Sequence, residues 1–487
     1  MHNINVEHPD YVRFKPIWRK YRDLYVGGEQ LREHASEYLV RRSKEPNEVY
    51  FERLSRVFYE NYIGSIIDWY AATLMRREPI ISCDGSNEAG KDFFAAFSED
   101  CDLRGTTITE FFRNQLVQAL ITGTGYIIVD FPRVTAPVSN RAQEDAVGKS
   151  RGFLVDYSPD EVINWSYDND GQLEWVILRT SSLRQASPAR NTWATQTRWM
   201  YYDREIFKNY QCATDSTGKV DKIELIDEGR HGLAGQARVP LFRLQVSEGL
   251  WLMNKAALLQ LEHFNKSNAL SWALTMGLFA TPVIYSEREW NQIVGESYYI
   301  QLGPDDRFGW TEPEGHVFQI AADNLERLKD EIYRVCHLMV QAGGTSSTQI
   351  SQSGLSKQRD FSITQEVLRA YGDSVKHTIK QVLCAINIAR QDGLAIDVSG
   401  LDEFDIGDFS VELDDARKLL DLGIHSQTLK KQLFKKLAFK YFCDVRQSIK
   451  DQIADEVDRS LASNSNEKEN HGGSETRGGN ADGTTAR

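Results

Sequence analysis

The stretch from residue 248 to residue 357 most constrains how this chain can fold, because it predicts two long helices with a compact insert between them. Apolar side chains recur every three to four residues along both helices. They are Leu250, Met253, Ala257, Leu261 and Phe264 in the first helix, and Leu325, Leu328, Ile332, Cys336 and Met339 in the second. A chain that leaves on one helix and returns on another places the insert at the end of a stalk, where it is suited to meeting a partner.

Capping residues and turn signals mark the ends of these segments. Asp323, followed by Glu326, is typical of a helix N-terminus, and Gly343 with Gly344 predicts the end of the second helix. Between the helices, short β-like runs are separated by turns rich in Gly and Pro. The runs cover residues 282–285, 298–302 and 316–320. The insert is therefore expected to be a small lobe of strands.

The bulk composition limits the classes of function. The 487 residues carry 57 basic and 70 acidic side chains, a formal net charge of −13. Tight, sequence-independent DNA binding depends on clustered Lys and Arg, so this charge argues against it but is compatible with DNA that passes close by without being held. The length predicts about two to four domains or layers. Six scattered cysteines without a CxxC pair indicate reduced thiols in a cytoplasmic fold.

One uncharged stretch, residues 267–286, approaches the length of a membrane span. It contains Gly277 and Pro282 together with several hydroxyl side chains, which favours a buried helix end that runs into a strand. The start of the chain has no basic-then-apolar signal segment. We therefore expect no contact with a membrane.

Periodicity in the rest of the chain predicts a mixed α+β architecture. Helical spacing is found in residues 48–77, 91–122, 356–392, 415–422 and 426–441. Ser426 is the expected N-cap of the last of these helices. Strand-like runs separated by turns fill residues 153–244, apart from residues 181–196, which are interpreted as an exposed polar loop. The polar tail from 463 to 487 is expected to be disordered.

Residues 85–92 imitate a phosphate-binding loop, because they have the glycine and lysine spacing G-x-x-x-x-G-K. The position that should hold Ser or Thr is Asp92, whose carboxylate would face the phosphates and offers no hydroxyl group for Mg²⁺. Glu88 adds a further negative charge. We expect an exposed turn that opens a helix rather than a nucleotide site.

No other pattern indicates chemistry. The ten histidines show no metal-ligand spacing, no G-x-S-x-G is present, and the dense carboxylates of residues 402–408 are typical of a solvated loop. We therefore expect no enzymatic activity, no metal and no cofactor. One basic face is interpreted as solvated, with contact to nucleic acid or an acidic partner as the alternative. It consists of Lys430, Lys431, Lys435, Lys436 and Lys440.

The order of several short motifs along residues 10–445 resembles that of the portal proteins of tailed bacteriophages. Each motif alone has little specificity, and their shared order carries the resemblance. The motifs are Trp18 with Tyr21-Arg22-Asp23-Leu24 and Gly27-Gly28, Tyr38-Leu39, a helix from Tyr50 that ends in Arg76-Arg77-Glu78-Pro79, Thr122 to Val129, Ser158 to Trp165, Gln301-Leu302-Gly303-Pro304, Ser353-Gly354-Leu355-Ser356, and Leu422 to Thr428. Leu355 stands where the family usually has a small residue.

The resemblance implies an α+β, mostly helical portal-type fold. In this fold a β-rich wing precedes two long stem helices that flank a small α/β clip, and a long tunnel helix and a helical crown follow. The segments would be the wing at 1–245, the first stem helix at 246–278, the clip at 279–320, the second stem helix at 321–341, the tunnel loop at 342–357, the tunnel helix and return to the wing at 358–411, and the crown at 412–462.

The resemblance also implies a function and partners. Twelve copies would form a ring at one capsid vertex of a virion assembled in the host cytoplasm, as the channel for packaging and ejection of double-stranded DNA. The clip would dock the large terminase and then the head–tail adaptor, and the ring would meet the major capsid and scaffold proteins. The channel loop would present Thr345, Ser346, Ser347, Thr348, Gln349, Ser351 and Gln352. The clip would present Glu287, Arg288, Trp290, Glu296, Tyr298, Asp305, Asp306 and Arg307.

Three other classes of protein remain open. Another virion assembly protein, such as an adaptor or a scaffold, would share the lack of catalytic motifs and would differ in ring stoichiometry. A P-loop-like nucleotide-binding enzyme would require residues 85–92 to bind ATP. A membrane protein would require residues 267–286 to partition into detergent.

Overall fold

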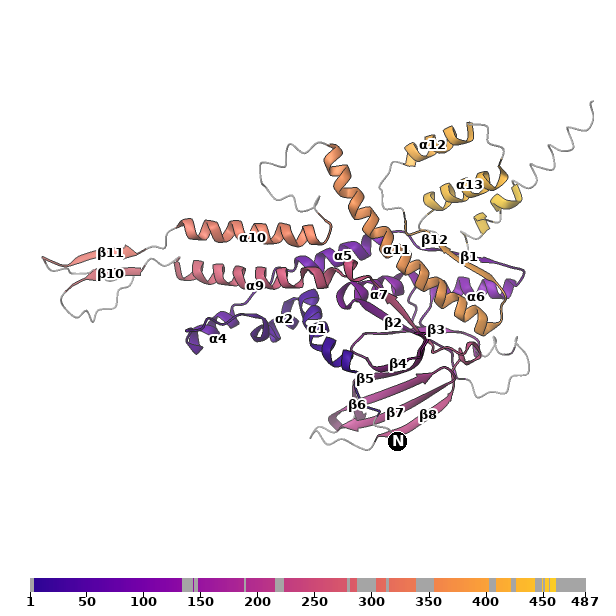
Figure 1. Cartoon of the computed structure of the whole chain (residues 1–487), viewed down its shortest axis with the longest axis horizontal. Helices are drawn as coiled ribbons and strands as arrows, with labels where there is room; N and C mark the ends of the chain where they lie inside the picture. Colours follow the sequence, from indigo (N-terminus) through magenta and orange to yellow (C-terminus); the bar gives the residue numbers. More distant parts are fainter. Residues whose placement is uncertain are drawn as a thin grey trace, which may run out of the picture.

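The computed structural model describes most of the chain, and its ranges are 4–133, 143, 148–187, 190–214, 223–277, 281–286, 304–311, 315–338, 354–402, 409–421, 426–442, 449, 452–454 and 456–460. Helices and antiparallel sheets form a body, and one long arm projects from it (Figure 1). The mixed α+β class predicted from the sequence is confirmed.

Helices from the first quarter of the chain surround the main apolar core. They are α1 (Pro9–Val26), α2 (Gly28–Glu33), α3 (Ala35–Tyr38), α4 (Asn47–Ser55), α5 (Tyr62–Leu74), α6 (Glu88–Glu99) and α7 (Ile108–Thr122). The predicted helical region 91–122 thus contains two helices. Side chains from distant parts of the chain, such as Phe264 and Tyr371, are fully buried in the same core. Burial of these apolar groups is the main force that holds the helices together.

The predicted helix over 48–77 is two helices, α4 and α5. The side-chain oxygen of Asn61 caps α5 by accepting a hydrogen bond from the Gly64 amide at 2.9 Å. The side-chain amide of Asn61 donates to the carbonyl oxygen of Tyr25 at 2.6 Å. The segment between the helices is therefore held against the end of α1, which breaks the apolar stripe, and Phe51 stays 63% exposed.

Two antiparallel sheets form the β-rich part of the body. The three-stranded sheet has the order β3-β2-β9, with β2 (Thr124–Asp130), β3 (Phe153–Tyr157) and β9 (Leu241–Gln245). The five-stranded sheet follows chain order, with β4 (Val162–Tyr167), β5 (Leu173–Ser187), β6 (Arg190–Asp203), β7 (Ile206–Thr214) and β8 (Glu224–Arg230). One face of this sheet packs against the three-stranded sheet through Val176 and Tyr202. The other face packs against Tyr11 and Trp18 of α1.

The predicted loop over 181–196 is wrong, because these residues form the outer half of the β5–β6 hairpin. Leu183 pairs with Thr195, and Gln185 pairs with Trp193. Residues 181–185 are exposed one after another, so both faces of this part of β5 are open to solvent. Without a buried face, the sequence lacks the apolar alternation that predicts a strand, and the backbone ladder alone defines the hairpin.

The arm consists of α9 (Leu252–Gly277) and α10 (Gly315–Val335), with β10 (Thr281–Tyr285) and β11 (Arg307–Thr311) at its far end (Figure 1). The two strands pair antiparallel, with Tyr285 opposite Arg307. The prediction of two stalk helices that carry a small β lobe is confirmed for the described residues.

Both predicted ends of the second arm helix are wrong. Residues 316–320 are helical rather than extended, and Asp323 lies inside α10, because α10 packs along α9 well before the apolar repeat begins. The helix ends at Val335 in a Schellman motif, in which the Leu338 amide bonds to the Tyr333 carbonyl at 2.9 Å. His337 takes the left-handed conformation of this motif, with φ of 61°.

The last long helix, α11 (Gly354–Arg390), crosses the body as predicted. It packs against β9 and against β12 (Ala395–Ser399), which pairs with β1 (Ile80–Asp84). Two shorter helices, α12 (Phe409–Asp421) and α13 (Gln427–Tyr441), follow on the far side of α11 from the five-stranded sheet (Figure 1). Ser426 caps α13 as predicted. The tail at 463–487 lies outside the described residues.

The chain that follows β12 passes very close to Gly372 of α11, and a substitution of this glycine tests that contact. Alanine is normally more favourable than glycine inside a helix, by about 1 kcal/mol. A Cβ atom at Gly372, however, would lie 2.3 Å from the carbonyl oxygen of Leu401. We expect Gly372→Ala to lower the free energy of unfolding by about 1–3 kcal/mol, measured by denaturant titration.

The control for this variant is Gly249→Ala, because a Cβ atom at Gly249 meets nothing within 4 Å. We expect this control to change the free energy of unfolding by less than about 0.5 kcal/mol. A Gly372→Ala protein more stable than the wild type would contradict the close approach.

Candidate functional site

The direction of the arm is set by residues 252–268 of α9, one side of which packs against the body. The side chain of Gln260 accepts from the Ile63 amide at 3.3 Å and donates to the Glu60 carbonyl at 2.8 Å. Asn268 makes the same two contacts with the backbone of Phe58, at 3.1 and 2.9 Å. A buried amide without such partners would cost about 1–3 kcal/mol, so these bonds fix how α9 leaves the body.

The sequence analysis missed these amide side chains. Asn265 belongs to the same set, since it accepts from the Val40 amide at 2.8 Å and donates to the Tyr38 carbonyl at 3.1 Å. The available signal was the presence of amide side chains among the apolar positions of the predicted helix. Such residues mark places where a helix binds the backbone of another segment.

The outer surface of the arm carries apolar side chains that the chain itself does not cover. Leu258 of α9 is 71% exposed and Val317 of α10 is 63% exposed, and Leu274 and Ile320 are also exposed. Burying one such side chain against a partner contributes about 1.5–3 kcal/mol. The arm is therefore a candidate docking surface.

Part of the predicted clip lies at the tip of the arm. Asp305 and Arg307 are exposed beside or within β11, and Asp306 is half-buried. The other predicted clip residues, Glu287, Arg288, Trp290, Glu296 and Tyr298, lie outside the described residues. The predicted channel residues lie outside them too, and these are Thr345, Ser346, Ser347, Thr348, Gln349, Ser351 and Gln352. Of the predicted site residues, the structure therefore describes only Asp305, Asp306 and Arg307, which lie just before β11 or at its start.

The base of the arm is tied to three helices where α10 ends. The ammonium group of Lys255 in α9 lies 3.1 Å from Nε2 of His337, which must accept because an ammonium group only donates. The Thr364 hydroxyl of α11 donates to the His337 carbonyl at 2.6 Å, and the Tyr70 hydroxyl of α5 donates to the Cys336 carbonyl at 2.7 Å. The position from which the chain leaves α10 is therefore fixed.

These contacts predict a pH dependence of stability. Burial first, and then the charge of Lys255, lower the pKa of His337 below its ordinary 6.5. Between the lowered pKa and 6.5 the unfolded chain binds more protons, so stability rises with pH across this window and is lost as the pH falls. We expect His337→Asn, which tolerates the left-handed backbone, to reduce the change in unfolding midpoint between about pH 5 and pH 7.5.

A partial pH dependence should remain in that variant, because burial also lowers the pKa of His263 and of His231. His316→Asn is the matched control, since His316 is exposed on α10. It should keep the wild-type dependence. An equal dependence in the His337→Asn protein would contradict the neutral, buried state of His337.

The segment 85–92 joins β1 to α6 as a closed turn. The side-chain oxygen of Asn87 accepts from the Gly90 amide at 3.1 Å, and the Asn87 carbonyl accepts from the Lys91 amide at 3.2 Å. The Lys91 ammonium group pairs with Glu88 at 3.1 Å. The Gly90 and Lys91 amides and the Lys91 ammonium group are therefore engaged within the chain, and the prediction of a helix-opening turn is confirmed.

Two features are absent from the part of the chain that the structure describes. No group of three or more His, Cys, Asp or Glu side chains gathers as a metal site would require. None of the helices combines the length and the apolar character needed to cross a membrane.

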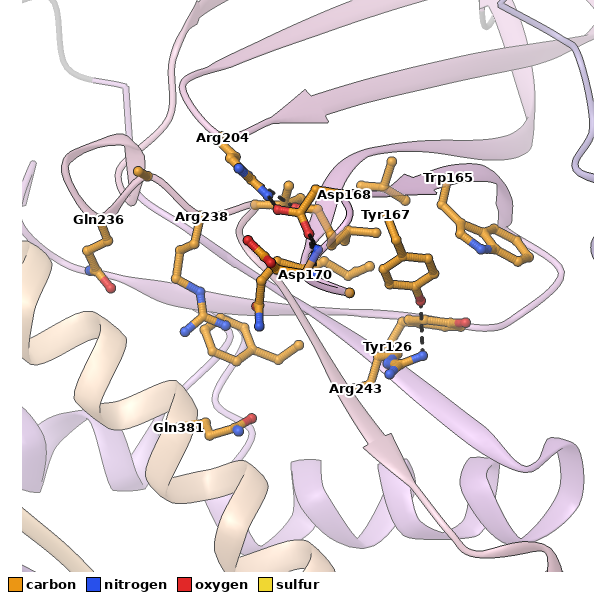
Figure 2. Close-up of a pocket in the computed structure, with 18 of the residues that line it drawn as sticks. Tyr126, Trp165, Tyr167, Asp168, Asp170, Arg204, Gln236, Arg238, Arg243 and Gln381 are labelled. Carbon is orange, nitrogen blue, oxygen red and sulfur yellow. Dashed lines mark hydrogen bonds and ion pairs between the residues drawn. The ribbon is translucent and has the colours of Figure 1, made fainter.

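A cavity of about 760 Å³ lies between the β4–β5 turn, β9 and α11 (Figure 2). Trp165, Tyr167 and Tyr126 form aromatic walls, and Gln381 of α11 closes one side. The turn is held open by Asp168, which pairs with Arg204 and accepts from the backbone amides of residues 170 and 172 at 2.9 and 2.8 Å. Arg204 and these amides lower the pKa of Asp168. The turn is therefore rigid, with its carboxylate already neutralised.

Two other arginines of the cavity differ from Arg204. Arg238 points into the cavity toward Gln381, over the ring of Phe242 at 4.2 Å (Figure 2). Arg243 donates to the Tyr167 hydroxyl at 3.1 Å. No carboxylate of the described chain pairs with either guanidinium group, and burial lowers the pKa of Arg238. The sequence analysis did not predict this site, because its residues come from segments far apart in the chain.

Comparisons with known proteins find no matching family model and no matching curated protein. Among solved structures, the chain is similar to a protein in the neck of an empty gene transfer agent particle computed with C6 symmetry. The identity is 14% over 77% of this chain and 90% of that chain, with a TM-score of 0.44.

Two further similarities are of the same kind. One is to a protein of the virion of a native gene transfer agent particle, with 14% identity, coverage of 82% and 96%, and a TM-score of 0.42. The other is to a protein in the neck of the native particle computed with C12 symmetry, with 13% identity, coverage of 76% and 89%, and a TM-score of 0.40. All three are distant likenesses.

Proposed function

We propose that this chain is the subunit of a portal-type ring, a dodecamer at one capsid vertex that forms the channel for packaging and ejection of double-stranded DNA. The observation that carries the proposal is the arm: α9 leaves the body, α10 returns, and the next described helix, α11, crosses the body (Figure 1). This order matches the stem, clip and tunnel helix that the resemblance implies.

The uncovered apolar surface of the arm supports assembly into a ring. Leu258 and Val317 are exposed in a single copy and lie on different helices of the arm. A closed ring joins two different faces of neighbouring copies, so side chains on both helices can be buried at once. The association would then gain from the same apolar burial that stabilises the body.

The partners follow from the same assignment. The tip of the arm would dock the large terminase during packaging and the head–tail adaptor afterwards, and the body would contact the major capsid and scaffold proteins. The net charge of −13 supports a channel along which DNA slides without being trapped. The proposal includes no enzymatic activity and no cofactor for this chain.

The stoichiometry of the purified protein tests the ring. We expect rings of twelve 55.6 kDa chains with a central hole, seen by native mass spectrometry and negative-stain imaging. Addition of salt should not dissolve them fully, because the exposed apolar side chains of the arm contribute to the contact. A chain that stays monomeric or dimeric with scaffold protein present would contradict the proposal and favour an adaptor or scaffold role.

The channel role proposed for the polar residues 345–352 is tested by removing them. We expect this deletion to leave the rings intact and to block DNA packaging, because the proposal assigns these residues to the channel and not to the contacts between copies. The control replaces them with eight other small, uncharged polar residues, which should retain packaging. Packaging by the deletion variant would show that the channel assignment is wrong.

A further inference from the structure

We propose that the cavity between the β4–β5 turn, β9 and α11 binds an acidic segment from a second copy of this chain. The segment begins at Leu401. This inference rests on the proposed ring for the presence of the second copy, and it names a specific contact between neighbours.

The charges of the cavity favour a carboxylate ligand. Among the described residues, Arg204 is neutralised by Asp168, whereas Arg238 and Arg243 have no carboxylate partner. A guanidinium group that is partly removed from water and rests only on an aromatic ring gains from an incoming carboxylate, since charge-assisted hydrogen bonds are about twice as strong as neutral ones. The lining also includes the carboxylate of Asp170, which forms no ion pair with either arginine. The site therefore holds the half-buried Arg238 and the exposed Arg243, both able to pair with an incoming carboxylate.

The shape of the cavity fits a short peptide segment rather than a single ion. Its volume of about 760 Å³ is far larger than a carboxylate group requires. Trp165 and Tyr126 give it apolar walls beside the arginines. A segment in which acidic and apolar side chains alternate would satisfy both kinds of surface.

The walls of the cavity are pre-formed. The side chain of Gln236 donates to the Ala385 carbonyl at 2.7 Å, which ties the turn before β9 to α11. The Thr378 hydroxyl of α11 contacts the Arg243 carbonyl at 3.5 Å, so the same helix also supports β9. A ligand would not have to order these segments, which lowers the entropic cost of binding.

One segment of this chain has the required alternation. Residues 401–409 read Leu-Asp-Glu-Phe-Asp-Ile-Gly-Asp-Phe, with four carboxylates between apolar residues. Asp402 is exposed, directly after the buried Leu401.

That starting position lies on the other side of α11 from the cavity. Leu401 packs against Gly372, whereas Gln381 lines the cavity. At about 100° per residue, nine residues of helix separate these two positions by roughly 180°. Figure 1 agrees, because the β1–β12 pair and the five-stranded sheet lie on opposite sides of α11.

A ring brings such opposite sides together. In a closed ring with rotational symmetry, one face of each copy meets the opposite face of the next copy. The acidic segment of one copy and the arginine cavity of its neighbour would then form the same contact around the ring. Each such contact would bring acidic side chains of one copy beside the two arginines of its neighbour.

Two charge-reversed variants and their mixture test this contact. The first carries Arg238→Glu with Arg243→Glu, and the second carries Asp402→Lys with Glu403→Lys. Each variant alone places like charges at every contact, so we expect rings to be lost or reduced at least about tenfold at low salt by native mass spectrometry. Mixed in equal amounts, the two variants should form alternating rings, because each reversed cavity then meets a reversed segment.

The control reverses two exposed charges elsewhere, Arg13→Glu with Lys44→Glu, and should assemble like the wild type. Rings formed by either single-type variant would overturn the proposal, and so would a mixture that fails to assemble although both variants keep the wild-type unfolding midpoint. Neither result would affect the proposed ring itself, which the wild-type protein tests.

If the wild-type protein forms no rings, the proposed function fails and the cavity is judged separately. A labelled peptide of residues 400–411 is then added to the wild-type chain, and binding is followed by fluorescence anisotropy. Binding that weakens at least about tenfold in the Arg238→Gln, Arg243→Gln protein supports the site. No binding, or equal binding of a peptide with its carboxylates replaced by amides, would overturn it.

Discussion

The arrangement of this chain depends on the anchored part of α9, residues 252–268. Gln260, Asn265 and Asn268 bind the backbone of segments that precede α5, so the helix is held by hydrogen bonds as well as by apolar contacts. Its 26 residues span about 39 Å, and the anchored residues 252–268 account for about 26 Å of this length. The residues after Asn268 continue in the same direction away from these contacts, so the direction of the arm follows from one anchored helix.

The end of α10, where the chain returns to the body, is also held by several contacts. The Schellman end of α10 places His337 in a left-handed conformation, and contacts from Lys255, Thr364 and Tyr70 hold the residues around it. The arm is therefore joined to the body by hydrogen bonds at both of its junctions. A force applied at the tip would thus be transmitted to α5 and α11 rather than absorbed by a flexible joint.

The helices of the arm could be predicted from the sequence because one face of each is buried: Met253, Phe264, Leu328 and Ile332 all lie in the core or against it. The start of α10 could not be predicted, since Val317 and Ile320 are exposed there and no apolar repeat exists. The outer β5–β6 hairpin escaped prediction for the same reason. Periodicity reports burial, and segments without a buried face leave no such pattern.

The cavity could not be predicted from the sequence. Strand pairing and the turn before β9 bring its side chains together from distant segments, and no regular spacing along the sequence relates them. The charges of the cavity nevertheless indicate which kind of ligand it favours. Partial burial of Arg238 removes favourable hydration, and in the described chain only the ring of Phe242 offsets this loss. Two carboxylates also line the cavity, but Asp168 pairs with Arg204, and Asp170 forms no ion pair with Arg238. A cation left without a carboxylate partner inside a pre-formed cavity is most stable when another molecule provides one.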